Sequence, residues 1–467
     1  GLRVWGLDDR NIWGDEGLVA WAARLPAAAI MDWTAHDVHP PLYFLLQRLW
    51  WFAVGDGEFV MRYPSVLVGV LGVLFIYRLG RTLGGPRAGL LAALFLAISP
   101  FAVSWSQEMR MYIGASTAAT AALWAALRTW QSGRWRWWGL YVLATAAGLW
   151  LLYLSVSVLI IANLAFLWVW IGRRLPWQAV LRWTAAQALA LLLFLPWLAY
   201  ALPRIPSWST AEPFTLLHFM QLYATTLALG ASEHLERYLL PVLLVLAALL
   251  LGLPLAWRRA DTAERRAGLA MLLLGLLLPA LLVYIVSLPI HIFYAPRLAP
   301  RYLIPLAACF YTLLALGLAA WAEKSRWLAG ALTATAVGVA LLGLAGFYPD
   351  RIRRDDLLSL AATLDAQRQP GDAVALYSDR DWPMFAAQYA GPWTGVPNGA
   401  PMEEQAAGWL LEPLWQGDEG LWLATTPDAL RMDPQGHVRR WLEERAVAVS
   451  AWNYGENALA FYARTPQ

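Results

Sequence analysis

The sequence predicts an α-helical, polytopic membrane protein with a small C-terminal α/β domain. Of its 467 residues, 59% are hydrophobic and only 14% are charged, and the mean hydropathy is +0.47. The apolar residues lie in long blocks, and about 20 such residues are needed to cross a hydrocarbon core of ~30 Å. After residue 350 the composition changes to one typical of a soluble domain.

The composition also excludes several kinds of site. A net charge of +3 is too small to indicate a nucleic-acid partner. Cys309 is the only cysteine and lies in an apolar block, so neither a disulfide nor a thiolate metal site is available. Lys324 is the only lysine, which excludes a P-loop and argues against Schiff-base chemistry. The energy for any reaction must therefore arrive within the substrate.

Ten apolar blocks are predicted to cross the membrane as helices. Arginines gather in alternate connections between them, as Arg78, Arg81 and Arg87 do in the first. Under the positive-inside rule these connections are cytoplasmic, so both ends of the chain lie outside. The predicted spans are residues 60–82, 88–106, 112–130, 137–153, 155–171, 183–202, 238–257, 267–289, 302–321 and 327–347.

Residues 1–58 are predicted to form an external loop with two interfacial helices, at 17–31 and 40–54. The second stretch is apolar but short for a span, and an arginine beside two tryptophans is typical of a helix in the membrane interface. Export of this loop requires a signal or anchor span, which we expect to precede the first residue. Residues 59–348 then form a transmembrane domain of about ten helices.

Residues 349–467 are predicted to form a soluble extracytoplasmic α/β domain. Pro370-Gly371-Asp372 is typical of a turn that leads into the strand-like run at 373–377. The other expected elements are a helix that begins at Arg351, strand-like runs at 421–425 and 446–451, and a helix around 437–445. This mixture of helical and strand-like patterns predicts the α/β class.

Asp15 and Glu16 are the first candidates for chemistry, because two adjacent carboxylates stand just before a predicted interfacial helix. A carboxylate at a membrane surface loses solvation and becomes a stronger base, which suits it to proton abstraction. A simpler interpretation is that Asp15 caps the helix that follows. Spacing alone leaves both roles open. The pair also permits a divalent metal ion without requiring one.

The segment His36-Asp37-Val38-His39-Pro40-Pro41 is the second candidate. Two histidines that flank an aspartate can bind a metal or an anion, whereas a solvated loop is the usual alternative. The proline pair restricts the backbone at the entry into the next helix. The spacing alone does not decide between these interpretations.

Two further candidates lie at the predicted outer ends of spans. Glu108, Arg110 and Tyr112 alternate along a short external link, and ionisable groups at a membrane boundary are usually paired or functional. Arg301 and Tyr302 begin a later span, where a guanidinium is suited to bind a phosphate at headgroup depth. The alternatives are a Glu108–Arg110 ion pair and an interfacial Arg-Tyr anchor.

Taken in order, these segments resemble the GT-C membrane glycosyltransferases. The nearest branch is family 39, which includes protein O-mannosyltransferases and aminoarabinose transferase-like enzymes. The resemblance covers roughly residues 10–347. It rests on Asp15-Glu16, His39-Pro40-Pro41-Leu42, Arg62 at the entry to a span, Ser99-Pro100-Phe101 leading to Gln107-Glu108-Met109-Arg110-Met111-Tyr112, and Arg301-Tyr302.

The resemblance implies an inverting glycosyltransferase of the plasma or inner membrane. Such an enzyme moves a sugar from a polyprenyl-phosphate-linked donor to an extracytoplasmic glycan, lipid or protein. It implies that Asp15 is the base, with Glu16 as its neighbour. The substrate-binding residues it implies are His39, Arg62, Glu108, Arg110, Tyr112, Arg301 and Tyr302, of which the two arginines Arg110 and Arg301 bind the donor phosphate. A lipid phosphate is already a good leaving group, so this reaction needs a base and cations but no nucleotide cofactor.

The sequence departs from the family pattern at one place, and two functions other than glycosyl transfer are also considered. Relatives often carry a His-Tyr pair where this chain reads Leu151-Leu152-Tyr153, so the acceptor pocket is expected to differ. A membrane transporter or lipid flippase with an external accessory domain would place charged or broken helices near mid-membrane, whereas most charges here lie at span ends. A binding or sensor protein is the third interpretation, in which Asp15 only caps a helix.

Overall fold

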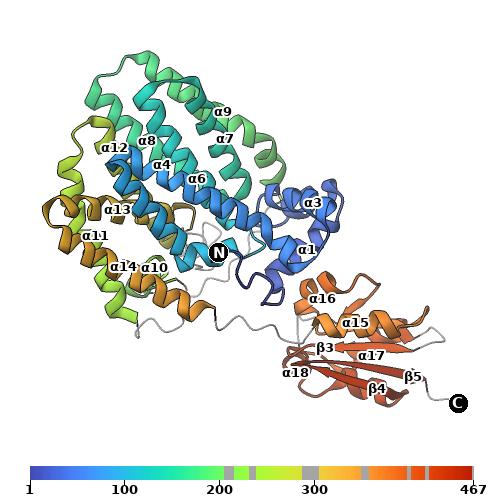
Figure 1. The fold of residues 1–467 in the computed structure, drawn as a ribbon. Coiled ribbons are helices and arrows are strands. Elements are labelled where there is room, and N and C mark those ends of the chain that lie inside the picture. The colour runs from blue at the N-terminus through green and yellow to red at the C-terminus, as the bar shows by residue number, and fades with distance from the viewer. Residues whose placement is uncertain are drawn as a thin grey trace. The chain divides into compact units, whose positions relative to one another are not determined.

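The computed structural model describes residues 1–204, 215–230, 238–286, 304–348, 357–396, 401–415 and 420–464. These residues belong to two compact units, whose elements are labelled in Figure 1. The helical unit comprises Gly1–Leu7 and Leu25–Arg351, and the C-terminal unit comprises Asp8–Arg24 and Ile352–Gln467. Part of the loop expected over residues 1–58 is thus grouped with the C-terminal unit.

Long apolar helices build the helical unit. Within the described part of the chain, seven helices are long and apolar enough to cross a membrane, judged by length and composition. They are α4 (Glu58–Ile98), α8 (Val156–Arg173), α9 (Trp177–Ala201), α11 (Leu239–Arg259), α12 (Ala263–Val286), α13 (Ala307–Lys324) and α14 (Arg326–Phe347). Two further predicted spans correspond to α6 (Tyr112–Ser132) and α7 (Trp135–Leu151).

Helix α4 covers the predicted span 60–82 and continues into the next, 88–106, with a break between them at Gly85, whose φ of 82° favours glycine. The span 88–106 is not one helix. Helix α4 ends before Ser99, and α5 (Pro100–Ser106) follows, because the residue before a proline is disfavoured in the helical conformation. The Ser99 hydroxyl accepts a hydrogen bond from the Ala102 N–H at 3.1 Å and caps α5. The apolar blocks did not predict α10 (Leu216–Ala228).

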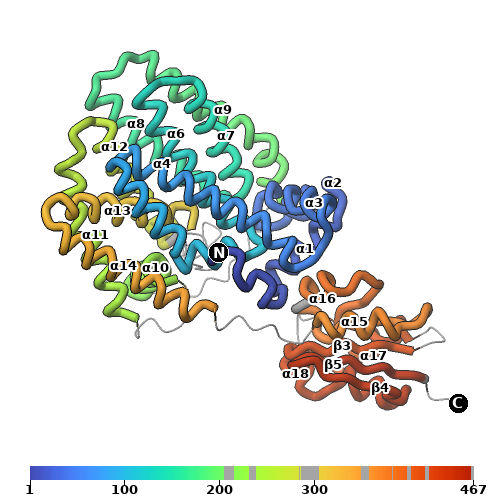
Figure 2. The backbone as a smooth tube through the Cα atoms, viewed as in Figure 1, coloured from blue at the N-terminus to red at the C-terminus, as the bar shows by residue number. Residues whose placement is uncertain are grey.

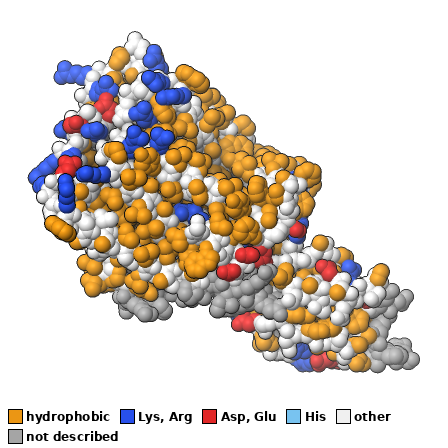
Figure 3. Space-filling model, viewed as in Figure 1, with side chains coloured by type: hydrophobic (Ala, Val, Ile, Leu, Met, Phe, Trp, Pro, Cys, Tyr) orange, Lys and Arg blue, Asp and Glu red, His pale blue; other side chains and the backbone are white. Residues whose placement is uncertain are grey.

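Helix α13 is the buried centre of the helical unit. Its residues from Ala307 to Ala320 are all buried, and it packs against α4, α11, α12 and α14. A Cβ on Gly252 of α11 would lie 2.5 Å from the Cα of Gly317, so the two glycines allow the backbones to approach closely. The outer helices instead expose many large apolar side chains, which cover much of this unit in Figure 3. That distribution suits a protein surrounded by lipid.

The C-terminal unit contains a five-stranded mixed sheet in the order β2-β1-β3-β5-β4. Figure 2 labels three of these strands, β3, β5 and β4. Strands β1, β2 and β3 are parallel, whereas β5 is antiparallel to both β3 and β4. The strands are β1 (Ala373–Tyr377), β2 (Thr394–Val396), β3 (Leu421–Thr425), β4 (Ala446–Tyr454) and β5 (Asn457–Arg464). Strands β1, β3 and β4 confirm the three predicted strand-like runs.

Alternate residues along β1 pack into two separate hydrophobic cores. Val374 and Leu376 pack with residues of α15 and α16, while Ala375 and Tyr377 pack with residues of α17 and α19. The helices of this unit are α15 (Leu357–Gln367), α16 (Trp382–Gln388), α17 (Glu404–Trp415), α18 (Ala429–Met432) and α19 (His437–Glu443). The predicted α/β domain is confirmed, and the predicted helix start at Arg351 lies outside the described residues.

The helix predicted over residues 17–31 is wrong. The chain forms two helices there, α1 (Gly14–Arg24) and α2 (Ala27–Ala35), because Pro26 lacks a backbone N–H and restricts the residue before it. The helix expected at 40–54 is present as α3 (Leu42–Val54). Its position in the membrane interface stays a prediction.

Helix α1 is tied closely to α16 within the C-terminal unit. The Arg24 guanidinium donates hydrogen bonds of 2.9 Å to the carbonyl oxygens of Ala386 and Ala387. The rings of Trp21 and Trp382 meet edge to face, with centroids 5.1 Å apart. These contacts explain why a segment near the N-terminus groups with a domain from the far end of the chain.

Gly17→Ala should loosen the packing of α1 on α16. A Cβ at Gly17 would lie 2.5 Å from the Pro383 carbonyl oxygen, a backbone atom that cannot move aside easily. We expect a loss of about 1–3 kcal/mol in the stability of this contact, measured as faster hydrogen exchange in α1. Gly14→Ala is the matched control, because a Cβ at Gly14 meets nothing within 4 Å. Equal exchange rates in the two variants would contradict the prediction.

Candidate active site

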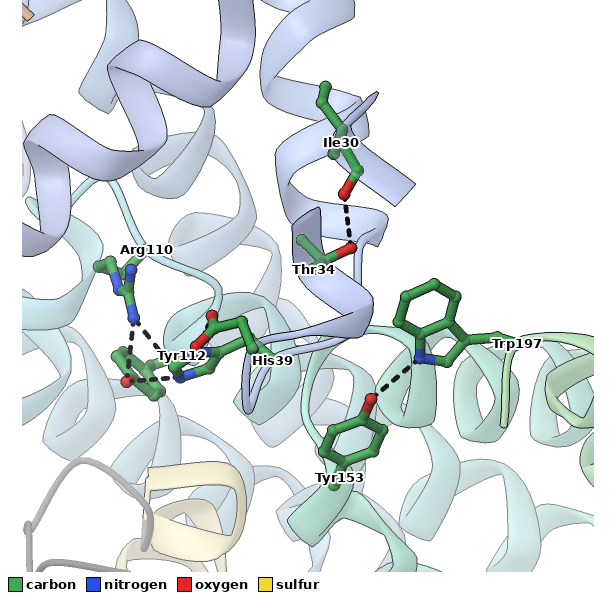
Figure 4. Close-up of polar contacts among 8 residues, drawn as sticks. Ile30, Thr34, His39, Arg110, Tyr112, Tyr153 and Trp197 are labelled. Atoms are coloured by element: carbon green, nitrogen blue, oxygen red, sulfur yellow. Dashed lines mark hydrogen bonds and ion pairs between the residues drawn. The ribbon is translucent and has the colours of Figure 1, made fainter. Parts of the chain in front are cut away.

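His39, Arg110 and Tyr112 come together in the helical unit (Figure 4). Nη2 of Arg110 lies 3.5 Å from Nε2 of His39 and 3.5 Å from the Tyr112 hydroxyl. The Tyr112 hydroxyl is also 3.5 Å from Nε2 of His39. All three side chains are buried. We call these three residues the His39 cluster.

Local sequence explains how the three residues reach this position. His39 lies in the turn between α2 and α3, and the prolines that follow it restrict the turn. Arg110 lies in the short link between α5 and α6, and Tyr112 is the first residue of α6. His39 and Arg110 therefore come from short connections next to helix starts, and Tyr112 comes from the helix itself.

Asp37 orients the His39 ring. Its carboxylate Oδ2 lies 3.0 Å from Nδ1 of His39, which leaves Nε2 directed at Arg110 and Tyr112. Burial alone would raise the pKa of the Asp37 carboxyl, but the hydrogen bond and charge of His39, with the charge of Arg110, hold this pKa below its usual range. The carboxylate is therefore charged at neutral pH. Asp37 was part of the predicted motif, but its role follows only from this contact.

Aromatic rings support the guanidinium of Arg110. Its central carbon lies 5.5 Å from the centre of the Tyr112 ring, and Trp105 meets that ring edge to face at 4.7 Å. A buried guanidinium held by a ring and a neutral or charged imidazole is well suited to bind an anionic oxygen, especially a phosphate. Glu108 is buried in the same link.

Asp37→Asn should remove a pH-dependent part of the stability. Because the folded-state pKa of Asp37 is lowered, its stabilising contribution is present above the ordinary carboxyl pKa and is lost as the pH falls through the folded value. We expect the substitution to cost about 1.5–3 kcal/mol at pH 7, and this difference should shrink below about pH 4. Thermal unfolding of both proteins between pH 3 and 7 measures it.

Asp32→Asn is the control for that experiment, since Asp32 is exposed and accepts a hydrogen bond from the Tyr200 hydroxyl at 3.0 Å. It should leave the unfolding temperature nearly unchanged at every pH. A difference between wild type and Asp37→Asn that did not depend on pH would contradict the assignment.

The N-terminal segment Gly1–Leu7 braces the link that carries Arg110. The Gln107 side-chain amide donates to the carbonyl oxygens of Leu2 and Trp5 at 2.9 and 2.8 Å. Arg3 donates to the Ser106 hydroxyl at 3.0 Å and to two carbonyls at the end of α4 at 2.9 Å. Gln107 belongs to the motif that carries the resemblance, but the sequence did not predict that it or Arg3 holds this link, because a single basic or amide residue carries no pattern.

Arg62, which the family resemblance assigned to substrate binding, is fully buried in α4. Its guanidinium donates a 2.8 Å hydrogen bond to the Leu7 carbonyl oxygen. This contact links α4 to the same N-terminal segment. In this structure Arg62 therefore holds α4 to the segment Gly1–Leu7.

Asp15 and Glu16 lie in the first turn of α1, so Asp15 is inside the helix and does not cap it from outside. Glu16 is fully buried, and its carboxylate lies 3.7 Å from the Arg10 guanidinium. Both residues belong to the C-terminal unit, whereas the His39 cluster belongs to the helical unit.

These two carboxylates do not fit a metal site well, because Glu16 already faces a cation. Across the described ranges, no group of three or more His, Cys, Asp or Glu side chains could hold a metal ion. Arg301 and Tyr302, the remaining predicted site residues, lie outside the described residues.

The position where relatives carry a His-Tyr pair is packed by aromatic rings in this chain. Tyr153 begins a short 3₁₀ turn, Tyr153–Ser155, between α7 and α8. Its hydroxyl accepts a 3.1 Å hydrogen bond from the Trp197 indole, as Figure 4 shows. Phe194 lies edge to face with Tyr153 at 6.2 Å.

One family model matches part of the chain. Residues 38–200 match the dolichyl-phosphate-mannose-protein mannosyltransferase family, and this segment includes the whole His39 cluster. No curated protein matches the chain in sequence.

Solved structures share the fold. ArnT from Cupriavidus metallidurans in the apo state has a TM-score of 0.66 at 14% identity, over 100% of this chain and 97% of ArnT. The Archaeoglobus fulgidus oligosaccharyltransferase in complex with Zn and sulfate has a TM-score of 0.58 at 14% identity, over 97% of this chain and 70% of that protein. The arabinofuranosyltransferase AftD from Mycobacteria scores 0.57 at 15% identity, over 97% and 39%.

These matches agree with the apolar helices and the small mixed sheet of the C-terminal unit. A second structure of ArnT, bound to undecaprenyl phosphate, has a TM-score of 0.62 at 14% identity, over 100% of this chain and 97% of that one. The family match and the shared architecture make this chain a multi-pass membrane protein of the GT-C fold, similar to family 39.

Proposed function

We propose that this protein is an inverting glycosyltransferase that moves a sugar from a polyprenyl-phosphate-linked donor to an extracytoplasmic acceptor. The observation that carries the proposal is the buried guanidinium of Arg110, held against His39 and Tyr112 at the start of α6. A cation in this setting is suited to a lipid phosphate. The fold shared with ArnT, of which one structure is bound to undecaprenyl phosphate, supports the choice of donor.

The proposed reaction is a single displacement. An acceptor hydroxyl attacks the anomeric carbon of the donor sugar while the bond from that carbon to the phosphate oxygen breaks. The hydroxyl proton passes to a carboxylate, and the lipid phosphate leaves with the bonding electrons. Because the attack comes from the face opposite the leaving group, the anomeric configuration is inverted.

Each chemical role is assigned to a residue. Asp15 is proposed as the base on the resemblance of its motif, with Glu16 held by Arg10 as its neighbour. Arg110 and Arg301 are proposed to stabilise the charge that develops on the phosphate. His39, Tyr112, Glu108, Arg62 and Tyr302 are proposed to form the surrounding donor site. The positive-inside rule supports an active site on the outer side of the membrane.

Turnover in proteoliposomes tests the proposal. Purified full-length protein is mixed with undecaprenyl-phosphate-linked sugars and with extracted envelope glycans, lipids or proteins as acceptors. Release of undecaprenyl phosphate together with transfer of label to an acceptor supports the glycosyltransferase. Movement of a lipid-linked sugar across the bilayer without any transfer supports the flippase and contradicts the proposal.

A further inference from the structure

A second polar region lies at the end of α6 opposite the His39 cluster. A cavity of about 950 Å³ there is bordered by α4, α6, α7 and the turn that opens α12. Tyr112 begins α6 and Arg128 lines the cavity, so the two are separated along the helix by about 24 Å. In Figure 3, basic side chains gather at the upper left of the helical unit. The proposed reaction uses nothing in this region.

The cavity carries an excess of positive charge. Its charged lining residues are Arg78, Arg81, Arg128, Arg136, Asp261, Glu264 and Arg265. The two acids are already paired, Asp261 with Arg265 at 2.8 Å and Glu264 with Arg173 at 2.6 Å. Within the part of the chain that the structure describes, the other four lining arginines have no carboxylate within 4.0 Å. An anion is therefore the complementary ligand.

An aromatic wall positions two of these guanidinium groups. The central carbons of Arg128 and Arg136 lie 5.1 and 4.7 Å from the centre of the same ring, that of Trp137. Trp124 supports this ring edge to face at 4.9 Å and donates its own N–H to the Thr82 hydroxyl at 3.1 Å.

Nη1 of Arg128 donates a 3.0 Å hydrogen bond to the Gln131 side-chain oxygen. A guanidinium has five N–H donors, so stacking and this one bond leave others for a ligand. The positive-inside rule accounts for arginines at helix ends, but it does not account for the aromatic ring that two of them share or for the cavity that they line.

An apolar stripe leads from the cavity along α4. Leu67, Val70, Leu71 and Leu74 are 48%, 57%, 43% and 48% exposed. Their spacing of three and four residues places them on one face of the helix, and Leu74 itself lines the cavity below Arg78. From Leu67 to Arg78 the helix rises about 16 Å, which matches a substantial part of an acyl chain.

We propose that this cavity binds the phosphate of an anionic phospholipid, with an acyl chain lying along the stripe from Leu67 to Leu74. Arginine binds phosphate through several charge-assisted hydrogen bonds, and basic pockets between membrane helices suit anionic headgroups. The stripe favours a lipid over a free phosphate, which would leave the apolar surface unused. This inference does not depend on the glycosyltransferase proposal.

Native mass spectrometry of the full-length protein in detergent tests the proposal by titration with phosphatidylglycerol. Removing two cavity charges in Arg78→Gln/Arg128→Gln should weaken this binding by about tenfold or more. Arg258→Gln/Arg326→Gln is the matched control, since it removes the same charge from exposed helix ends outside the cavity. The control should bind within about twofold of wild type, because it leaves the cavity intact.

Further measurements distinguish a phospholipid from a soluble phosphate as the ligand, and a variant that keeps the charge controls for misfolding. Trp137→Leu removes the ring on which Arg128 and Arg136 stack, and should weaken phosphatidylglycerol binding by about threefold without any change in charge. Phosphatidylcholine should bind more weakly than phosphatidylglycerol, and soluble glycerol phosphate should not displace the lipid. Equal losses in the two double variants, equal binding of both lipids, or displacement by glycerol phosphate would each overturn the proposal.

Discussion

Arg110→Gln should weaken the binding of undecaprenyl phosphate by about 10- to 100-fold, because charge-assisted hydrogen bonds to a phosphate are lost and glutamine restores none of the charge. His39 and Tyr112 both lie 3.5 Å from the guanidinium and are placed to support it. Titration of the purified protein with undecaprenyl phosphate, by thermophoresis, measures the effect.

Arg110→Lys should retain part of the affinity, since it keeps the charge but loses the planar fork of N–H donors. Arg326→Gln serves as the control, because Arg326 is exposed at the start of α14. Unfolding temperatures of all three variants show whether the fold is intact. Unchanged affinity in a folded Arg110→Gln protein would remove Arg110 from the donor site.

Asp15→Asn should lower turnover by about 10²- to 10⁴-fold, the usual contribution of a general base, because an amide cannot accept the proton of the acceptor hydroxyl. Affinity for undecaprenyl phosphate should stay within about twofold of wild type, since Asp15 is not assigned to the phosphate. Initial rates of label transfer in proteoliposomes, together with the same thermophoresis titration, separate the two quantities.

Asp9→Asn is the matched control for this second experiment. Asp9 lies in the same stretch, Asp8–Arg24, and is exposed. Its substitution should leave turnover unchanged. If Asp15→Asn turned over as fast as Asp9→Asn, the base would have to be another residue, whereas the phosphate assignment of Arg110 would stand on its own test.

The membrane helices were predictable from local sequence. About 20 consecutive apolar residues can only cross a bilayer as a helix, because every backbone N–H and C=O must be paired within the segment. Each of the ten predicted spans accordingly overlaps a helix of the structure. Strand β1 (Ala373–Tyr377) was equally predictable from local sequence, because a turn at Pro370-Gly371 precedes a short apolar run.

The breaks within helices were less predictable, although their causes are also local. Ser99 before Pro100 ends α4 inside a predicted span, and Pro26 divides α1 from α2 inside a predicted helix. In both places an apolar pattern continued across a proline, and the backbone restriction outweighed the pattern.

By itself, the sequence determined that this chain is a membrane protein built from long helices, and its motifs pointed to His39, Arg110, Tyr112 and Asp15. Tertiary structure alone brought His39 against Arg110, which is 71 residues away, and grouped α1 with α16, where Arg24 bonds to a carbonyl 362 residues away. Such contacts form because distant surfaces match in shape and hydrogen bonding. Local periodicity reports which face of a helix is apolar, and it carries no information about which partner that face will meet.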